Sequence, residues 1–341
     1  MNENLGGRLS AALNTIHILP RRMLLDTPGV LATVPMLRGV WGAALHDLDP
    51  LAYAVVFGPN DESRGPPARH STSIRRPPHR AGLALADVMA ATQAGQPAPP
   101  AIHAGGTAAA GYVLRPAPPD PEFAPAVEWI LIGEAVRHDF PLCRAWDVAS
   151  GMGLGPERRR FHIRRILALQ SDGQAVDQAR PWTLGAARWR PASTASTGGA
   201  ARDLAPDHPC RLAFPSPLRL MQQGRLIERP TLADLIVAAC RRVKAYLPLA
   251  ERDRWDDLSR QALEAARATP AKAWRGNRLD LRRYSGRQHA ELELRGVAGY
   301  LELPRGPGEL RPLLAAATWL HVGKGTVMGL GQMNVEDTSN G

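Results

Sequence analysis

The clearest local pattern in the sequence is a glycine-rich stretch from Gly323 to Gly331, which reads GKGTVMGLG. The glycines at 323, 325, 329 and 331 allow close backbone approach to a ligand, so that several backbone N–H groups can bind a phosphate. Lys324 adds a positive charge. The order of residues differs from the P-loop pattern GxxxxGK[ST]. Taken alone, the stretch fits a phosphate-binding loop and a tight helix-to-strand turn equally well.

A second group of candidate residues is a dense run of arginines, at positions 158, 159, 160, 164 and 165. On a strand that begins at Phe161, Arg158, Arg160 and Arg164 would share one face with His162. Such a face could follow the phosphates of an RNA backbone. The alternative is a solvated edge of a sheet.

Histidine is the natural general base in this chain, because its unperturbed pKa of about 6.5 lies near neutral pH. Ten histidines are present. His17 lies on the first predicted strand and His46 at the end of the first predicted helix, where it could equally serve as a helix cap. His321, beside the glycine-rich stretch, is expected to be structural or to contact RNA. No pair of histidines has metal-ligand spacing with a neighbouring carboxylate, so we expect no metal and no other cofactor.

The composition points to a polyanionic partner. The chain has 341 residues and a formal net charge of +10, and only Lys244, Lys272 and Lys324 among its 42 basic residues are lysines. The planar guanidinium of arginine binds phosphates bidentately, which favours nucleic acid as the partner. The abundance of Ala, Arg, Gly and Pro is also typical of a GC-rich genome, which leaves a compositional explanation open.

The remaining composition indicates a cytoplasmic protein. Cys143, Cys210 and Cys240 are odd in number and form no CxxC pair, so we expect neither a disulfide framework nor a Cys-based zinc site. The N-terminus lacks the basic start and apolar run of a signal peptide. No stretch reaches the roughly 18 apolar residues of a membrane span, so no membrane partner is expected.

Two stretches rich in Pro, Gly and Ser divide the chain. The first, from about 58 to 106, predicts a long Pro/Arg-rich loop, and the second, from 191 to 200, predicts a linker. We therefore expect one domain over residues 1–204 and another over residues 205–341.

The periodicity of apolar residues predicts the same order of elements in both domains, with one helix inserted in the second. In the first, strands are expected at 14–19, 53–57, 112–115, 127–135 and 161–169, with helices at 36–47 and 138–150. In the second, strands are expected at 211–220, 279–284 and 328–335, a strand pair turning at Gly296 within 290–303, and helices at 231–247, 251–268 and 310–320. The predicted fold class is α+β, with two tandem ferredoxin-like (RRM-like) β-α-β-β-α-β domains.

Several segments resemble the CRISPR-associated repeat-processing endoribonucleases of the RAMP superfamily, whose hallmark is a glycine-rich loop before the last strand. In the second half these segments are FPSPLRLMQQGR (214–225), YSGRQ (284–288), LRGVAG (294–299) and LHVGKGTVMGLG (320–331). In the first half they are LRGVWGAALH (37–46), YVLRPAPP (112–119) and GLGPERRRF (153–161).

This resemblance implies two ferredoxin-like domains and metal-independent cutting of CRISPR precursor RNA within its repeats. A ribose 2′-OH attacks the adjacent phosphorus and leaves a 2′,3′-cyclic phosphate and a 5′-OH. His46 lies in the segment that resembles the first helix of the family and is the first candidate for the base, with Tyr53 as a partner and His17 as the alternative base. The candidate RNA contacts are Arg38, Arg158, Arg159, Arg160, Arg164, Arg287, Gly323, Lys324, Gly325, Gly329 and Gly331.

Two other functions are open at this point. The chain could be a non-catalytic RNA-binding subunit of a CRISPR effector complex, or a general RRM-like RNA-binding module. His46 distinguishes the first alternative from the enzyme, because a scaffold subunit has no chemical use for it. The expected partners are CRISPR repeat RNA and its crRNA product, with other subunits of an effector complex as further candidates.

Overall fold

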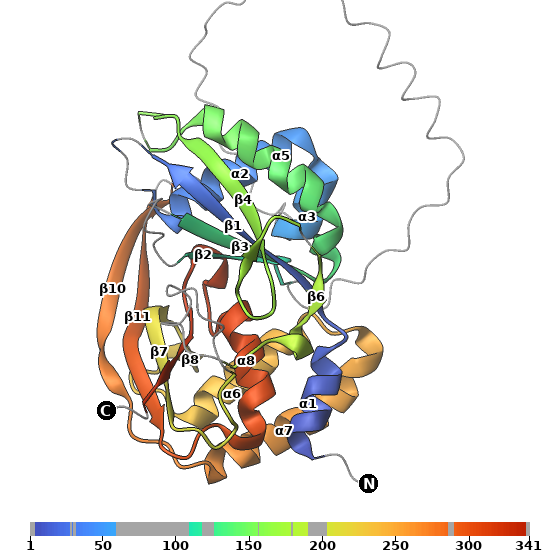
Figure 1. Cartoon of the computed structure of the whole chain (residues 1–341). Helices are drawn as coiled ribbons and strands as arrows, with labels where there is room; N and C mark the ends of the chain where they lie inside the picture. Colours follow the sequence, from blue (N-terminus) through green and yellow to red (C-terminus); the bar gives the residue numbers. More distant parts are fainter. Residues whose placement is uncertain are drawn as a thin grey trace, which may run out of the picture. The chain divides into compact units, whose positions relative to one another are not determined.

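The computed structural model describes residues 4–27, 29, 32–58, 109–117, 126–155, 157–178, 180–189, 203–285 and 290–338, the last two ranges with backbone only for 281–285 and 290–294. Figure 1 shows two main antiparallel sheets that follow each other along the chain. The first carries helices α2, α3 and α5, and the second carries α6, α7 and α8, each set packed in a hydrophobic core.

The first sheet has the strand order β2-β3-β1-β4-β5, with β6 paired to β1. Its strands are β1 (His17–Asp26), β2 (Tyr112–Pro116), β3 (Ala126–Ile132), β4 (His162–Leu169), β5 (Ala175–Val176) and β6 (Trp182–Thr183). Helix α2 (Val34–Leu48) follows β1, while the 3-10 turn η1 (Gly133–His138) and α5 (Asp139–Met152) precede β4. This is the β-α-β-β-α-β arrangement of a ferredoxin-like domain.

Helix α2 forms where its capping residues and apolar spacing predict it. The Thr33 side chain accepts a hydrogen bond from the Met36 N–H, which satisfies one of the free donors of the first turn. On the buried face, Leu37, Trp41 and Leu45 lie four residues apart. The Trp41 ring stacks on Trp146 of α5, with 4.9 Å between the ring centroids.

The strand predicted at 53–57 is wrong, because these residues form helix α3 (Pro50–Phe57). The β-branched residues Val55 and Val56 favour a strand locally. Helix initiation outweighs that preference, since Asp49 caps the Ala52 N–H at 2.9 Å and Pro50 stands at the first helical position. Ala52 and Val56, one helical turn apart, are then both buried.

The second sheet has the order β10-β11-β7-β12. Its strands are β7 (Cys210–Leu218), β10 (Arg275–Ser285), β11 (Ala290–Leu303) and β12 (Asn334–Asp337), with a small separate pair β8 (Met221–Gln222) and β9 (Arg225–Leu226). Helices α6 (Leu232–Lys244) and α7 (Arg252–Ala268) follow β7, and α8 (Arg311–Leu320) precedes β12. The predicted α+β class with two ferredoxin-like units is confirmed.

The predicted turn at Gly296 is wrong, because β11 is one long strand paired with β10 along its length. The glycines allow close strand packing here instead of a turn. A Cβ on Gly296 would lie 2.8 Å from the Pro217 Cβ, and one on Gly299 would lie 2.2 Å from the Arg275 carbonyl oxygen. The strand predicted at 328–335 is wrong for most of its length, because residues 326–328 form a 3-10 turn and the strand itself runs only over Asn334–Asp337.

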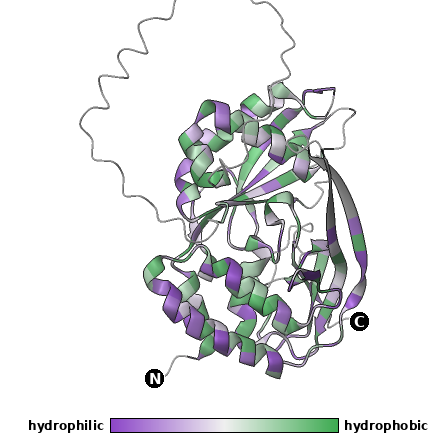
Figure 2. Cartoon of the chain, turned by 180° about the vertical axis from the view of Figure 1, so that it is seen from behind, coloured by the Kyte–Doolittle hydropathy of each residue, from purple (hydrophilic) through white to green (hydrophobic). Residues whose placement is uncertain are grey.

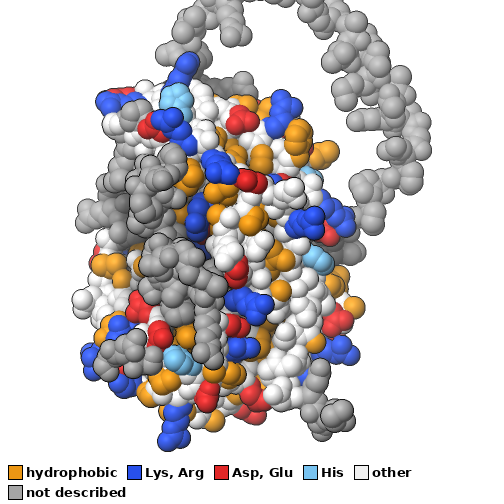
Figure 3. Space-filling view, in the orientation of Figure 1, with side chains coloured by type: hydrophobic (Ala, Val, Ile, Leu, Met, Phe, Trp, Pro, Cys, Tyr) orange, Lys and Arg blue, Asp and Glu red, His pale blue; other side chains and the backbone are white. Residues whose placement is uncertain are grey.

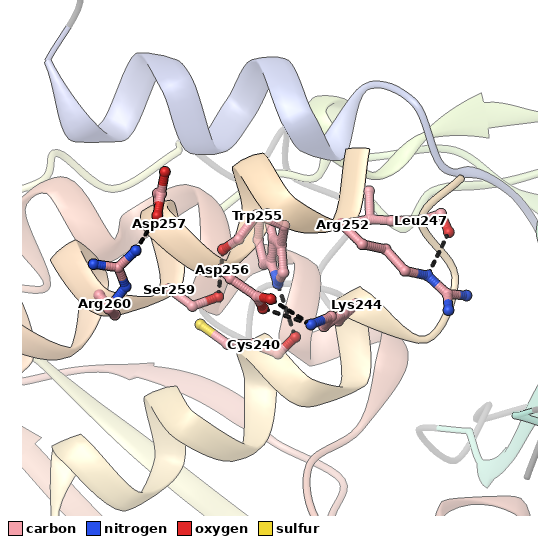
Figure 4. Close-up of polar contacts among 9 residues, drawn as sticks. All are labelled: Cys240, Lys244, Leu247, Arg252, Trp255, Asp256, Asp257, Ser259 and Arg260. Atoms are coloured by element: carbon pink, nitrogen blue, oxygen red, sulfur yellow. Dashed lines mark hydrogen bonds and ion pairs between the residues drawn. The ribbon is translucent and has the colours of Figure 1, made fainter. Parts of the chain in front are cut away.

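Helices α6 and α7 are held together by a buried polar contact and an ion pair (Figure 4). The Trp255 indole N–H donates to the Cys240 carbonyl oxygen at 3.0 Å, and Lys244 pairs with Asp256 at 2.6 Å. Figure 2 shows hydrophilic and hydrophobic stripes alternating along these helices, as expected where one face is buried. Helix α6 is thereby fixed in rotation about its axis.

A helix that precedes the first strand was not predicted. Helix α1 (Leu5–Leu13) buries Leu5, Leu9 and Leu13 in the same core cluster as α7 and α8 of the second sheet. Within the described ranges, no helix is both long enough and apolar enough to cross a membrane.

Candidate functional site

The structure brings His46 and Tyr53 together at the corner between α2 and α3. The His46 ring meets the Tyr53 ring edge-on, with 5.1 Å between the centroids, and Tyr53 stacks on Phe57 at 4.9 Å. The His46 side chain is 54% exposed, and its Nδ1 lies 3.6 Å from an Asp47 carboxylate oxygen. An imidazole that is oriented by an aromatic ring and open to solvent can accept a proton from a bound ligand.

Arg38 is connected to the same aromatic group. Its Nε donates to the Tyr112 hydroxyl at 2.7 Å, and its guanidinium lies over the Phe57 ring at 5.6 Å. Burial raises the pKa of Tyr112 to about 12 in spite of the neighbouring Arg38 charge. Tyr112 is therefore neutral, and the charge of Arg38 is not cancelled by this contact.

His17, the alternative base, lies elsewhere on the first sheet. It is the exposed first residue of β1 and faces Thr183 of β6 in the strand pairing. It takes no part in the aromatic group around Tyr53 and Phe57. Of the two candidate bases, His46 is therefore the one that the fold places beside the predicted partner Tyr53.

The glycine-rich stretch is anchored to the end of β7. The Lys324 N–H donates to the Arg219 carbonyl oxygen at 2.9 Å, and the Gly331 N–H donates to that of Pro217 at 3.0 Å. Between them, Gly325 and Gly329 both adopt the left-handed backbone conformation on either side of a 3-10 turn. The backbone of the stretch is therefore fixed at both ends by the second sheet.

Two of these glycines serve close packing inside the protein. A Cβ on Gly329 would lie 3.2 Å from the Val34 Cγ1, and one on Gly331 would lie only 1.8 Å from the Val322 carbonyl oxygen. Both glycines are buried or nearly so, whereas Lys324 is exposed and Gly323 is partly exposed. Gly325 is partly exposed as well, so Gly323, Lys324 and Gly325 are the members that reach the surface. Phosphate binding by all five residues stays a prediction.

Gly331→Ala is expected to lower the free energy of unfolding in two ways: alanine is strained at a positive φ, and its Cβ collides with a carbonyl oxygen. We expect the collision to add about 1–3 kcal/mol to the loss that the strain alone causes. Gly308→Ala is the matched control, since Gly308 also has a positive φ but nothing lies within 4 Å of its Cβ position. Urea unfolding of both variants measures the difference. Equal losses would show that the stretch relaxes freely and that packing does not require Gly331.

The glycine-rich stretch and His46 lie at opposite ends of helix α2. Gly329 packs against Val34 in the first turn, and His46 follows twelve residues later, which is about 18 Å along the helix axis. An RNA that contacts both regions must therefore extend along α2, over more than one nucleotide.

His321 ends helix α8 directly before the glycine-rich stretch. It is fully buried, and its Nδ1 lies 3.0 Å from the Leu330 carbonyl oxygen, to which it donates. Burial, with the nearby charges of Arg115 and Arg242, lowers the pKa of His321 well below its ordinary value. Its backbone has φ 60° and ψ 164°, a combination that is strained for any residue but glycine. His321 is thus a neutral residue that shapes the loop.

The arginine run does not form the predicted strand face. Arg158 has a φ of 51° in the tight turn before β4, which begins only at His162, so Arg158 and Arg160 precede the strand. Arg159 donates to Glu157 and to the Gly29 carbonyl oxygen. Arg158 and Arg159 therefore belong to a turn, which the alternation of residues along a strand did not indicate.

Part of the charge of this run is offset by carboxylates. Arg164 pairs with Asp26 at 2.6 Å, and Arg165 pairs with Asp177 at 2.5 Å. On the face shown in Figure 3, basic side chains lie among acidic ones. RNA binding by Arg158, Arg159, Arg160 and Arg164 stays a prediction, and Arg287 lies outside the described residues.

Sequence reasoning missed three arginines beside Gly323 and Lys324. Arg219 at the end of β7 and Arg241 and Arg242 on α6 line a pocket of about 420 Å³ together with these two residues. The signal was present in the pair Arg241–Arg242 within a helix, but nothing local indicated that the helix faces the glycine-rich stretch. The described residues contain no group of three or more His, Cys, Asp or Glu arranged to hold a metal ion.

The second half of the chain is similar to a known protein family. Residues 212–333 match the family model described as CRISPR-associated endoribonuclease Cas6. The fold is similar to that of a product complex of Cas6 (TTHB231) from Thermus thermophilus, at a TM-score of 0.51 and 14% identity, covering 94% of this chain and 99% of that one. The family match confirms the resemblance to the CRISPR repeat-processing endoribonucleases over residues 212–333.

Two further solved structures are similar at lower TM-scores. A product complex of Cas6 (TTHA0078) has a TM-score of 0.49 and 16% identity, over 94% of this chain and all of that one. A partial Cas6-RT-Cas1–Cas2 complex has a TM-score of 0.48 and 12% identity, over 96% of this chain and 47% of that one. No curated protein matches the chain in sequence.

Proposed function

We propose that the protein is an endoribonuclease that cuts CRISPR precursor RNA within its repeats to give crRNA. The observation that carries this proposal is the match of residues 212–333 to the Cas6 endoribonuclease family. That range includes the glycine-rich stretch. The proposed partners are CRISPR repeat RNA, its crRNA product and other subunits of a CRISPR effector complex.

In the proposed reaction, His46 accepts the proton of a ribose 2′-OH while the oxygen attacks the adjacent phosphorus. The bond to the 5′-oxygen of the next nucleotide breaks, and that oxygen takes up a proton from solvent water, which leaves a 2′,3′-cyclic phosphate and a 5′-OH. Tyr53 holds the imidazole by the edge-on ring contact, at 5.1 Å between centroids. A positioned base of this kind needs no metal ion to supply the nucleophile.

Positive charge for the RNA backbone comes from the same helix and from the glycine-rich stretch. Arg38 lies eight residues before His46 on α2, about 12 Å along the axis, so it suits a phosphate near the reacting one along the strand. Lys324 is exposed farther away and suits a more distant phosphate. Electrostatic stabilisation of the reacting phosphate by cations is a large part of catalysis in phosphoryl transfer.

Incubation of the purified protein with RNA of its own CRISPR repeat, in EDTA, tests the proposal. We expect one cut per repeat and an upstream product that resists enzymes requiring a free 3′-OH. A 2′-deoxy sugar at the nucleotide before the cut should abolish cleavage but not binding, because it removes the nucleophile. Cleavage only after addition of a divalent ion would refute the metal-independent mechanism.

The alternative function, a non-catalytic RNA-binding subunit of a CRISPR effector complex, gives a different result in the same assay. Such a subunit would bind the repeat with unchanged affinity for the deoxy-substituted RNA and would never cut either RNA. The exposed His46 held against Tyr53 favours the enzyme, because RNA binding alone does not require an oriented imidazole.

A further inference from the structure

We infer that the pocket between α6, the end of β7 and the glycine-rich stretch binds one nucleotide of the RNA strand, away from the cut. Its phosphate would lie at the basic end formed by Arg219, Arg241, Arg242 and Lys324, and its base against the apolar wall. This inference rests on the proposed function insofar as the ligand is RNA.

The charge of the pocket favours a phosphate. Among the described residues that line it, four are basic, Arg219, Arg241, Arg242 and Lys324, and one is acidic, Asp234. The Asp234 carboxylate is already engaged, because it accepts hydrogen bonds from the Thr231 N–H and hydroxyl at 2.9 and 2.7 Å. The lining therefore carries an excess of positive charge, which attracts an anion.

Two guanidinium donors in the pocket lack an acceptor. Within the described part of the chain, the Arg219 Nε and the Arg242 Nη2 are buried and form no hydrogen bond. A buried donor without a partner destabilises the folded protein, so its retention calls for an explanation. Phosphate oxygens provide the missing acceptors, and charge-assisted hydrogen bonds to them are stronger than neutral ones.

Arg242 is held in place for this contact. Its Nε donates to the Leu320 carbonyl oxygen at 3.3 Å, and its guanidinium lies over the Tyr246 ring at 5.1 Å. One edge of the guanidinium is therefore fixed by the protein, while Nη2 stays without an acceptor among the described residues. Helix α6 itself is fixed by its contacts with α7 (Figure 4), so little order has to be gained on binding.

The pocket has a basic end and an apolar middle. Along α6, the lining runs from Asp234 through Val237 and Ala238 to Arg241 and Arg242, about 10 Å farther along the axis. The basic end meets the glycine-rich stretch, because the Lys324 N–H donates to the Arg219 carbonyl oxygen. Leu220, Met221 and Ile227 complete the apolar lining.

The size and position fit one nucleotide of a longer strand. A volume of about 420 Å³ exceeds what a phosphate alone needs and is within the roughly 300–1,000 Å³ of small-molecule sites. The glycine-rich stretch that borders the pocket packs at the end of α2 opposite to His46. The bound nucleotide is therefore separate from the one that is cut.

Binding of repeat RNA that carries a 2′-deoxy sugar before the cut tests the inference. Arg241→Gln and Arg242→Gln should each weaken the Kd about tenfold or more at low salt, the loss expected for a charged hydrogen bond. The slope of log Kd against log salt should fall by about 0.7 for each phosphate that the variant no longer binds. Ala238→Phe, which fills the pocket without removing charge, should weaken binding as well. Arg267→Gln, at an exposed position on α7, is the matched control.

The outcomes separate this inference from the proposed function. Normal RNA affinity of Arg241→Gln and Ala238→Phe, in folded proteins with wild-type melting temperatures, would overturn the inference and leave the enzyme proposal intact. A second outcome would also overturn the inference: AMP competes for the pocket of the wild type, the variants abolish that competition, and their RNA affinity is unchanged. The ligand of the pocket would then be a free nucleotide. A protein that binds repeat RNA through the pocket but never cuts it would refute only the proposed function.

Discussion

His46→Ala is expected to lower the single-turnover rate of repeat cleavage by about 10²–10⁴, the usual contribution of a positioned acid or base. Folding should be nearly unaffected, because a histidine at the end of a helix contributes only about 0.3–1 kcal/mol through the helix dipole. RNA binding should stay close to that of the wild type, since the side chain is one exposed group at the corner of α2 and α3. Rapid mixing with excess protein, followed by gel analysis, measures the rate.

Leu51→Ala is the matched control for this experiment. Leu51 is 80% exposed on α3 at the same corner and carries no titratable group, so its removal should leave the rate unchanged. Tyr53→Phe keeps the ring that meets His46, whereas Tyr53→Ala removes it, so only the second should slow cleavage if Tyr53 acts by orientation. A wild-type rate for His46→Ala would contradict the assignment and make His17 the next candidate for the base.

Glu128→Gln is expected to lower the free energy of unfolding by about 3–5 kcal/mol, the cost of breaking a buried ion pair on one side. The Glu128 side chain is 2% exposed and lies between Arg22 of β1 and Arg115 of β2, at 2.7 Å from each. Strand pairing sets these three residues in one row across the sheet. Chemical unfolding in urea at neutral pH measures the loss.

The matched control is Glu134→Gln, which removes one side of the exposed pair with Arg137 and should cost no more than about 1 kcal/mol. A pH series adds a second readout. Burial alone would raise the pKa of Glu128, but the charges of Arg115 and Arg22 outweigh it and hold the pKa below its ordinary value. The wild type should therefore lose stability as the pH falls below about 4.3, and Glu128→Gln should lack that share of the loss. Equal losses for both variants at neutral pH would contradict the importance of the buried pairs.

Arg115, one of the two partners of Glu128, also connects the two sheets. Arg115 donates to the Thr318 carbonyl oxygen at 2.7 Å and lies over the Trp319 ring at 4.9 Å, so it joins β2 to helix α8.

The division of the chain at residue 204 stays a prediction.

Local sequence signals determined most of the fold. Thr231 caps α6 and its apolar residues follow helical spacing, so the helix was predictable from residues within one or two turns. The order of strands and helices was enough to indicate two ferredoxin-like units, and the glycine-rich stretch, Lys324 and His46 were all found by residue type. These features depend on contacts between near neighbours in the chain.

The tertiary structure decided what these residues meet. Tyr53 belongs to a helix because the Asp49 cap and burial of Ala52 and Val56 outweigh the local strand preference. The contact between His46 and Tyr53 depends on the angle between two helices, and the pocket joins Arg219, Arg242 and Lys324 from distant parts of the sequence. Such contacts form when whole helices and strands pack together, and the packing energy depends on residues that are far apart in the chain. The sequence around any one residue therefore does not indicate which contacts that residue will make.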